Sequence, residues 1–179
     1  MAAFSMEVWL RRVRNKLARR LPLDPEGAKL QYTKDHAAVL SLARVVEWAG
    51  SKGISVHFSK VNGGTYHERM KRIDVSSKGD PETQLCTLLH ECGHYLIYRS
   101  GGKHKFPNGY ARIDEGIESR DALHKIDVIA EEYEAWHRAL DLAKRLNILL
   151  DKQRFDEIRA SYLKTYFRWA LRRGRVSND

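Results

Sequence analysis

Five consecutive residues of the chain could carry out hydrolytic chemistry: His90-Glu91-Cys92-Gly93-His94, an H-E-x-x-H motif. On an α-helix, histidines four residues apart project from one face, so His90 and His94 can bind the same Zn²⁺ ion. Glu91 is offset from His90 by about 100°, which lets it reach a metal-bound water without being a ligand. The motif therefore predicts a zinc-dependent peptidase with Glu91 as general base, in which activated water attacks a peptide carbonyl.

The residues around the motif predict the helix that it requires. Asp80 is a suitable N-cap, Pro81 suits the first helical position, and Gly101-Gly102 is a stop signal. One face of this helix carries an apolar stripe, made of Leu85, Leu89, Cys92 and Leu96. We therefore expect a helix over about 81–98, with both histidines beside the buried stripe.

A catalytic zinc needs a third protein ligand and an open position for water. A third histidine six residues after His94 is excluded, because position 100 is serine. A helix predicted at about 126–146 offers Glu131, Glu132 and Glu134 instead, and its buried stripe is expected to be Ile129, Tyr133, Trp136 and Leu140. Glu132 lies about 80° from the centre of that stripe, Glu134 about 120° away and Glu131 nearly opposite. Glu132 is therefore the favoured third ligand.

Other ligands and an oxyanion donor are left open by the sequence. Glu131 or Glu134 could replace Glu132, and further candidates lie elsewhere: Glu115, Glu118, His124 and His137. The donor for a tetrahedral oxyanion has three candidates: Tyr110, His124 and Tyr133.

The remaining elements predict a helix-rich α+β fold with a small mixed or antiparallel sheet beside the active helix. Helices are expected at about 4–21, 35–50 and 154–173, a chain break at 21–27, and extended segments at 54–58 and 66–76, the second best formed at 72–76. The stretch 100–125 has no clear period and predicts a functional loop, a lid or disorder. The expected core faces are Val39, Leu42, Ala43, Val46 and Ala49 in the second helix, and Phe155, Ile158, Tyr162, Tyr166 and Trp169 in the last. A length of 179 residues suits one domain, 1–179, with its core at 54–146.

The net charge of +9 is concentrated at the two ends of the chain. Residues 1–20 carry six Lys or Arg against one acidic residue, and residues 152–179 carry eight against three. In the last helix, Lys164, Arg168, Arg172 and Arg175 fall on one side, a row that could follow nucleic-acid phosphates or be a solvated face. Nucleic acid is therefore a candidate partner.

The composition indicates a cytoplasmic protein that is not embedded in a membrane. No apolar run approaches the roughly 18 residues of a membrane span, and the arginines of residues 1–21 do not precede an apolar block as in a secretory signal. Cys86 and Cys92 lie six apart on one helix, about 9 Å apart, which is too far for a disulfide. Their expected state is a free thiol in a reducing compartment.

The H-E-x-x-H motif, followed on a later helix by glutamate in the E-x-E-A sequence 132–135, resembles the gluzincin metallopeptidases. The likeness is greatest to the minimal cytoplasmic ImmA/IrrE-like type of bacteria, phages and mobile elements, and covers about residues 54–146. The resemblance implies a zinc site of His90, His94 and Glu132 acting on a specific protein. In those proteins the edge strand of a short sheet binds the substrate, which implies that role for 72–76. If nucleic acid is bound by the basic ends, two peptidase roles follow by analogy. One is cleavage of a DNA-bound repressor, as in the ImmA/IrrE-like proteins, and the other is removal of proteins crosslinked to DNA, as in SprT-like proteases.

A rival interpretation is a non-enzymatic basic protein that binds nucleic acid or serves a phage as an accessory factor. Its motif would be vestigial, or would form a structural zinc site. A structural site is normally closed by four protein ligands, and the sequence offers Cys86 or His124 as the fourth. The oligomeric state is not indicated by the sequence.

Overall fold

The computed structural model describes residues 25–110 and 122–171. In chain order, this part of the chain contains helix α2 (Pro25–Ser51), strands β1 (Ser55–Ser59), β2 (Gly64–His67) and β3 (Arg72–Ser76), and helices α3 (Pro81–Arg99), α4 (Gly102–Lys105), α6 (Ala122–Arg145) and α7 (Lys152–Leu171). The expected α+β architecture with a small mixed sheet is confirmed. The predicted helix at 4–21 lies outside the described residues.

Helix α2 begins about ten residues earlier than its apolar pattern predicts. Pro25 stands at its first residue, where the missing N–H would have no helical partner and the ring fixes a helical φ. The predicted break therefore did not extend to Gly27, which lies inside the helix. The buried face is also rotated from the prediction, since Val45 is fully buried while Ala43 and Val46 are half-buried. Gly53, at φ +75°, lies just beyond the end of the helix.

The three strands form one sheet in the order β1-β3-β2, with β1 parallel and β2 antiparallel to β3. The strand 72–76 has its predicted bounds, but the expectation that it is an edge strand is wrong. It lies in the centre of the sheet, which explains why Ile73 and Val75 are fully buried. The chain between β1 and β3 is long enough for the crossover connection that two parallel neighbouring strands require. Strand β2 lies within this connection and pairs with the other side of β3, so β3 is central and β2 is at the edge.

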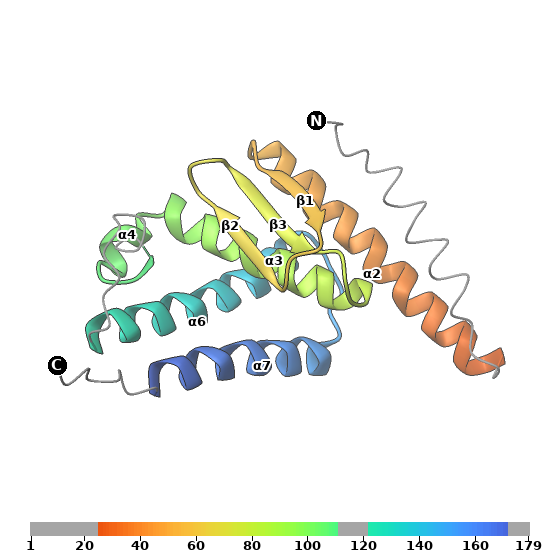
Figure 1. Cartoon of the computed structure of the whole chain (residues 1–179). Coiled ribbons are helices and arrows are strands. Elements are labelled where there is room, and N and C mark those ends of the chain that lie inside the picture. The colour runs from red at the N-terminus through yellow and green to blue at the C-terminus, as the bar shows by residue number, and fades with distance from the viewer. Residues whose placement is uncertain (1–24, 111–121, 172–179) are drawn as a thin grey trace.

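Helix α3 lies in the middle of the molecule, packed against the sheet, α2 and α6 (Figure 1). Burial on several sides is why most of its residues are inaccessible to solvent, well beyond the single predicted stripe. Leu96, a member of that stripe, is only half-buried. The helix with the H-E-x-x-H motif is thus the central element of the core.

Helix α6 crosses α3 with a different face from the predicted one. Tyr133, expected inside, is 52% exposed, whereas Glu131, expected nearly opposite the core, is 3% exposed. Ile129 and Leu140 are half-buried, and only Trp136 of the predicted stripe is fully buried. The helix instead buries a face of three alanines and two aliphatic residues, made of Val128, Ala135, Ala139, Leu142 and Ala143.

Helix α7 packs along α6 (Figure 1). Phe155 and Ile158 are buried as predicted, while Tyr162, Tyr166 and Trp169 are half-buried. Within the predicted loop 100–125, residues 102–105 form α4 and residues 111–121 lie outside the described part. No helix among the described residues is long and apolar enough to cross a membrane.

Candidate metal centre

The start of α3 is set by its own sequence, as predicted. Asp80 is the N-cap: its Oδ1 accepts a hydrogen bond from the backbone N–H of Thr83 at 2.8 Å, and its Oδ2 one from the Thr83 hydroxyl at 2.9 Å. Burial alone would raise the pKa of Asp80, but the bonds from Thr83 and the nearby charge of Arg154 hold it below its usual value. Pro81 follows at the first helical position. These contacts fix the helical register in which the motif is displayed.

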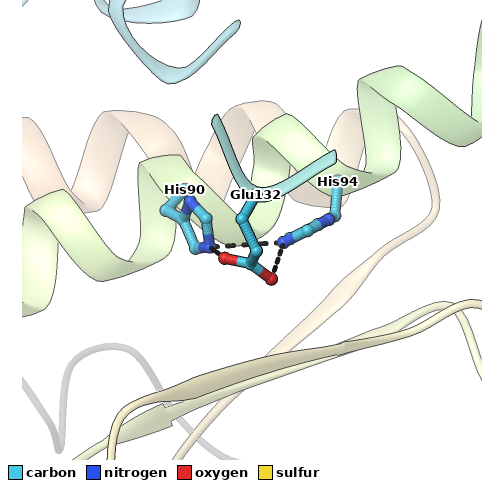
Figure 2. Close-up of side chains that lie close together, drawn as sticks. All are labelled: His90, His94 and Glu132. Atoms are coloured by element: carbon cyan, nitrogen blue, oxygen red, sulfur yellow. Dashed lines mark hydrogen bonds and ion pairs between the residues drawn. The ribbon is translucent and has the colours of Figure 1, made fainter. Parts of the chain in front are cut away.

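Three side chains converge at the middle of α3 and α6. The Nε2 atoms of His90 and His94 lie 3.2 Å apart, and the Glu132 carboxylate lies 3.2 Å from His90 Nε2 and 3.4 Å from His94 Nε2. Figure 2 shows both imidazoles on α3 pointing toward the carboxylate that α6 contributes. All three residues are buried, and their donor atoms could hold a metal ion.

The spacing of these donor atoms fits a metal ion. Ligands on a tetrahedral zinc, with bonds of about 2.0–2.1 Å, lie about 3.3–3.5 Å from one another. The three separations between these donor atoms fall close to that range. Among the described residues, the Oε2 atom of Glu132 is buried without a hydrogen bond of good geometry, and it lies 3.2 Å from His90 Nε2. A buried carboxylate oxygen without a donor is costly unless a cation lies beside it, so the residues present suit a bound cation.

A glycine makes this convergence sterically feasible. A Cβ atom on Gly93 would lie 2.2 Å from the carbonyl oxygen of Ala135, far inside any normal contact distance. The backbones of α3 and α6 therefore approach closely at this point. Because Gly93 adjoins His94 and Ala135 lies three residues after Glu132, the close crossing brings the carboxylate within reach of both histidines.

The electrostatics of the site couple the two helices. Burial alone would lower the pKa of His94, but the carboxylates of Glu132 and Glu131 raise it to about 10. Burial likewise opposes ionisation of Glu132, yet the two histidines hold its pKa well below its usual range. His90 stacks on the indole of Trp136, with ring centroids 4.4 Å apart. The third candidate ligand, Glu132, is thus held as a carboxylate, the form that can bind a metal ion.

Glu91 lies in the same cleft and is not part of the three-residue cluster. Its carboxylate is buried, which raises its pKa, and the backbone N–H of Tyr66 in β2 donates a hydrogen bond to it. A Cβ on Gly64 would lie 2.7 Å from Glu91 Oε1 and 2.6 Å from Thr87, so only glycine allows β2 to approach this closely. The edge strand and the predicted general base are therefore in direct contact.

The three side chains and Glu91 face an open cleft of about 470 Å³. One wall is the edge strand β2 with the turn after it, another is α3, and the remaining wall includes Tyr110 and Tyr166. The residues that line it are Gly64, Thr65, Tyr66, His67, Glu68, Arg69, Met70, His90, Glu91, His94, Tyr98, Tyr110, Glu132 and Tyr166. A cleft of this size can admit a short stretch of extended peptide.

The structure distinguishes the alternative ligands proposed from sequence. Glu131 is buried behind His94, with its Oε1 3.6 Å from the Nδ1 of that histidine. Glu134 is half-buried and forms ion pairs with Lys105 and Arg138. His137 is exposed, and His124 donates through Nδ1 to the carbonyl of Asn108. Glu115 and Glu118 lie outside the described residues.

Among the oxyanion candidates, only Tyr110 lines the cleft, and its hydroxyl donates to Glu132 Oε1 at 2.6 Å. Tyr133 is exposed to solvent. Tyr166, assigned to the core from its helical spacing, instead lines the cleft, and its hydroxyl hydrogen bonds with Tyr110 and Glu132. Nothing in the sequence separates Tyr166 from the core residues of the same stripe, because only the position of α7 turns it toward the metal centre.

Both cysteines are buried free thiols, as the spacing predicts. Burial raises the pKa of Cys86 to about 12 and that of Cys92 still further. Neither cysteine joins the cluster of candidate ligands among the described residues. Of the basic row on the last helix, Lys164 and Arg168 are exposed, whereas Arg172, Arg175 and residues 1–20 lie outside the described ranges.

Comparisons with protein-family models, with curated proteins and with solved structures gave no match to this chain. The function of the cleft is therefore inferred from its own residues and geometry.

Proposed function

We propose that this protein is a zinc-dependent peptidase that hydrolyses a peptide bond in a specific protein substrate. The observation that carries the proposal is the buried cluster of His90, His94 and Glu132, which opens on the same cleft as Glu91. Two histidines and one carboxylate are a ligand set of catalytic zinc sites, which keep a position for water or substrate. Zinc bound there supplies a Lewis acid that lowers the pKa of water to about 7 and polarises a carbonyl oxygen.

Glu91 acts as the general base and acid. It projects from α3 one residue after His90, lines the cleft and takes no part in the ligand cluster. Its carboxylate removes a proton from the attacking water and later transfers that proton to the leaving amine. The amine therefore leaves in its neutral form when the peptide bond breaks. The hydrogen bond from the backbone N–H of Tyr66 holds the carboxylate in the cleft.

The substrate binds in an extended conformation beside β2. This strand is at the edge of the sheet, lines the cleft along its length and contacts Glu91 through Tyr66 and Gly64. An unpaired strand edge offers backbone N–H and carbonyl groups in the spacing that an extended peptide requires. We therefore assign to β2 the substrate-binding role that the family resemblance implied for 72–76.

Three observations favour this function over a structural or vestigial metal site. A structural zinc site is normally closed by four protein ligands, and the cluster found within the described residues has three. Cys86 and His124, the candidates for a fourth, are not part of it. The cluster also opens on a cleft that contains Glu91.

In support of a gluzincin of the ImmA/IrrE-like type, a short sheet precedes the motif helix and the third ligand, a carboxylate, comes from a later helix. We infer a cytoplasmic location from the two free thiols.

The decisive experiment combines metal content with cleavage of an unbiased substrate. Zinc per chain is measured by elemental analysis in untagged protein, and cleavage is followed by mass spectrometry on a peptide library derived from a whole proteome. We expect about one zinc in the wild type, a marked loss in Glu132→Ala, and full zinc without cleavage in Glu91→Gln. Glu134→Ala removes a half-buried carboxylate of the same helix and is the matched control, with both properties retained.

Two results would refute the proposal. Wild-type protein that takes up no zinc after reconstitution would show that the cluster does not bind this metal. Cleavage by Glu91→Gln at the wild-type rate would show that the carboxylate does not transfer the proton. Nucleic-acid binding through the basic ends is a separate proposal, tested by the salt dependence of the binding constant, which must fall as salt rises.

A further inference from the structure

Residues 106–110, between α4 and the end of the first described range, lie against α6 on the metal-centre side. Asn108 attaches this segment to the first turns of α6. Its backbone N–H and its side-chain amide both donate to Asp127 Oδ2, at 2.8 and 3.1 Å. Its carbonyl accepts from His124 Nδ1 at 2.6 Å, and His124 is buried. The segment is therefore fixed to the helix that carries the third ligand.

The two residues after Asn108 contact the two buried glutamates of α6. Gly109 lies so close to Glu131 that a Cβ there would be 2.9 Å from Glu131 Oε2. The hydroxyl of Tyr110 donates to Glu132 Oε1 at 2.6 Å. Glu131 in turn lies 3.6 Å from His94 Nδ1, so the segment contacts one candidate ligand directly and borders the glutamate beside a second.

The other end of the segment is also anchored. Phe106 is buried and packs with Ile97 of α3 and Ala135 of α6. Its carbonyl accepts a hydrogen bond from the N–H of Gly109 at 3.1 Å. The segment thus runs from the α3–α6 crossing at Phe106 to the third ligand at Tyr110, and its two anchors, Phe106 and Asn108, both precede Gly109 and Tyr110.

Groups that hydrogen-bond to metal ligands commonly have a strong effect on metal affinity, although they do not touch the metal themselves. A glutamate side chain has several rotamers, and a hydrogen-bond donor to its carboxylate selects one of them. Loss of such an outer partner typically weakens metal binding by about 10–100-fold. Tyr110 makes this contact, and Asn108 and Asp127 hold Tyr110 in place.

We propose that the segment 106–110 sets the metal affinity of the site, with Tyr110 as the positioning residue for Glu132 and the Asn108–Asp127 contact as its anchor. The inference rests on the proposed metal site, but it makes no claim about peptide hydrolysis. It predicts that Asp127, which touches none of the three ligands, controls how tightly they hold zinc.

The test measures the dissociation constant of Zn²⁺ by competition with a chromophoric chelator, on the full chain. We expect Tyr110→Phe to weaken zinc binding by about 10–100-fold. Tyr133→Phe removes a hydroxyl from an exposed neighbour of Glu132 and should leave the dissociation constant unchanged. Circular dichroism and thermal unfolding of the metal-free proteins establish that the variants are folded.

A second pair of variants keeps the proposal falsifiable if Tyr110→Phe does not fold. Asp127→Ala removes the acceptor of both Asn108 bonds and should weaken zinc binding, whereas Asp127→Asn keeps an acceptor oxygen and should restore most of the affinity. Wild-type affinity in both Tyr110→Phe and Asp127→Ala would overturn the inference and leave the proposed function standing. A wild type that binds no zinc would overturn both, so the two failures are distinguishable.

Discussion

Replacing Gly93 by alanine tests the close helix crossing that brings the candidate metal ligands together. An added Cβ would lie 2.2 Å from the carbonyl oxygen of Ala135 and 2.9 Å from its carbonyl carbon. These are backbone atoms of α6, so no side chain can rotate away to make room. Ordinary contact requires more than about 3.4 Å, and the two helices must therefore separate by about 1 Å at the crossing.

A shift of that size is large compared with what a metal site tolerates. Metal–ligand distances must be met to within about 0.2 Å, and Glu132 reaches the two histidines only through the close approach of α6. We expect Gly93→Ala to lose most of its zinc at a concentration that saturates the wild type. Overpacking of the helix crossing should also lower the free energy of unfolding by about 1–3 kcal/mol.

Gly50 provides the matched control for the effect of alanine itself. It also lies in a helix, and a Cβ there would meet no atom within 4 Å. Alanine is intrinsically favoured over glycine in helices by up to about 1 kcal/mol, so Gly50→Ala should retain zinc and be as stable as the wild type or more stable. Elemental analysis and urea unfolding of both variants give the answer. Gly93→Ala with wild-type zinc and stability would show that the contact with Ala135 does not position Glu132.

Three further predictions follow from the cap, the core and the thiols. Asp80→Ala should lower the free energy of unfolding by about 1 kcal/mol near neutral pH. The pKa of Asp80 is lowered in the folded state, so this difference should persist above the unfolded Asp value of about 4 and vanish as pH falls through the folded value; a difference independent of pH in urea titrations would contradict the cap. Trp136→Ala should cost about 3–5 kcal/mol in the same titrations, because its indole is fully buried against His90 and Phe155, and a loss below about 1 kcal/mol would contradict that packing. Cys86 and Cys92 should react with a thiol reagent only after unfolding, since both are buried with raised pKa values, and rapid reaction of the native protein would refute this.

The features predicted well are those that depend on neighbours in the sequence. The start of α3 was predicted from Asp80 and Pro81, because capping involves residues within one turn. The strand 72–76 has its predicted bounds, because alternation of buried and half-buried residues is a property of the strand itself. The common face of His90 and His94 also follows from helical geometry over four residues.

The features predicted wrongly depend on which helices and strands pack against one another in the folded protein. The expected buried face of α6 was centred on its large apolar residues, but the helix turns Ala135 toward α3 and leaves Tyr133 exposed. The rotation places Glu131 in the interior, opposite to the prediction. The edge position of β2 was missed for a similar reason, because strand order depends on the crossover between β1 and β3.

The sequence alone determined the helix that carries the motif, the two histidines on one face of it and the glutamate between them, because these relations are local. It also favoured Glu132, although from a helical phase that the structure revises. Only the tertiary structure decided which carboxylate meets the histidines, which strand borders the cleft, and that Tyr110 and Tyr166 lie over Glu132. The physical reason is that the close approach of two backbones at Gly93 sets the position of α6, and that approach depends on atoms about forty residues apart in the chain.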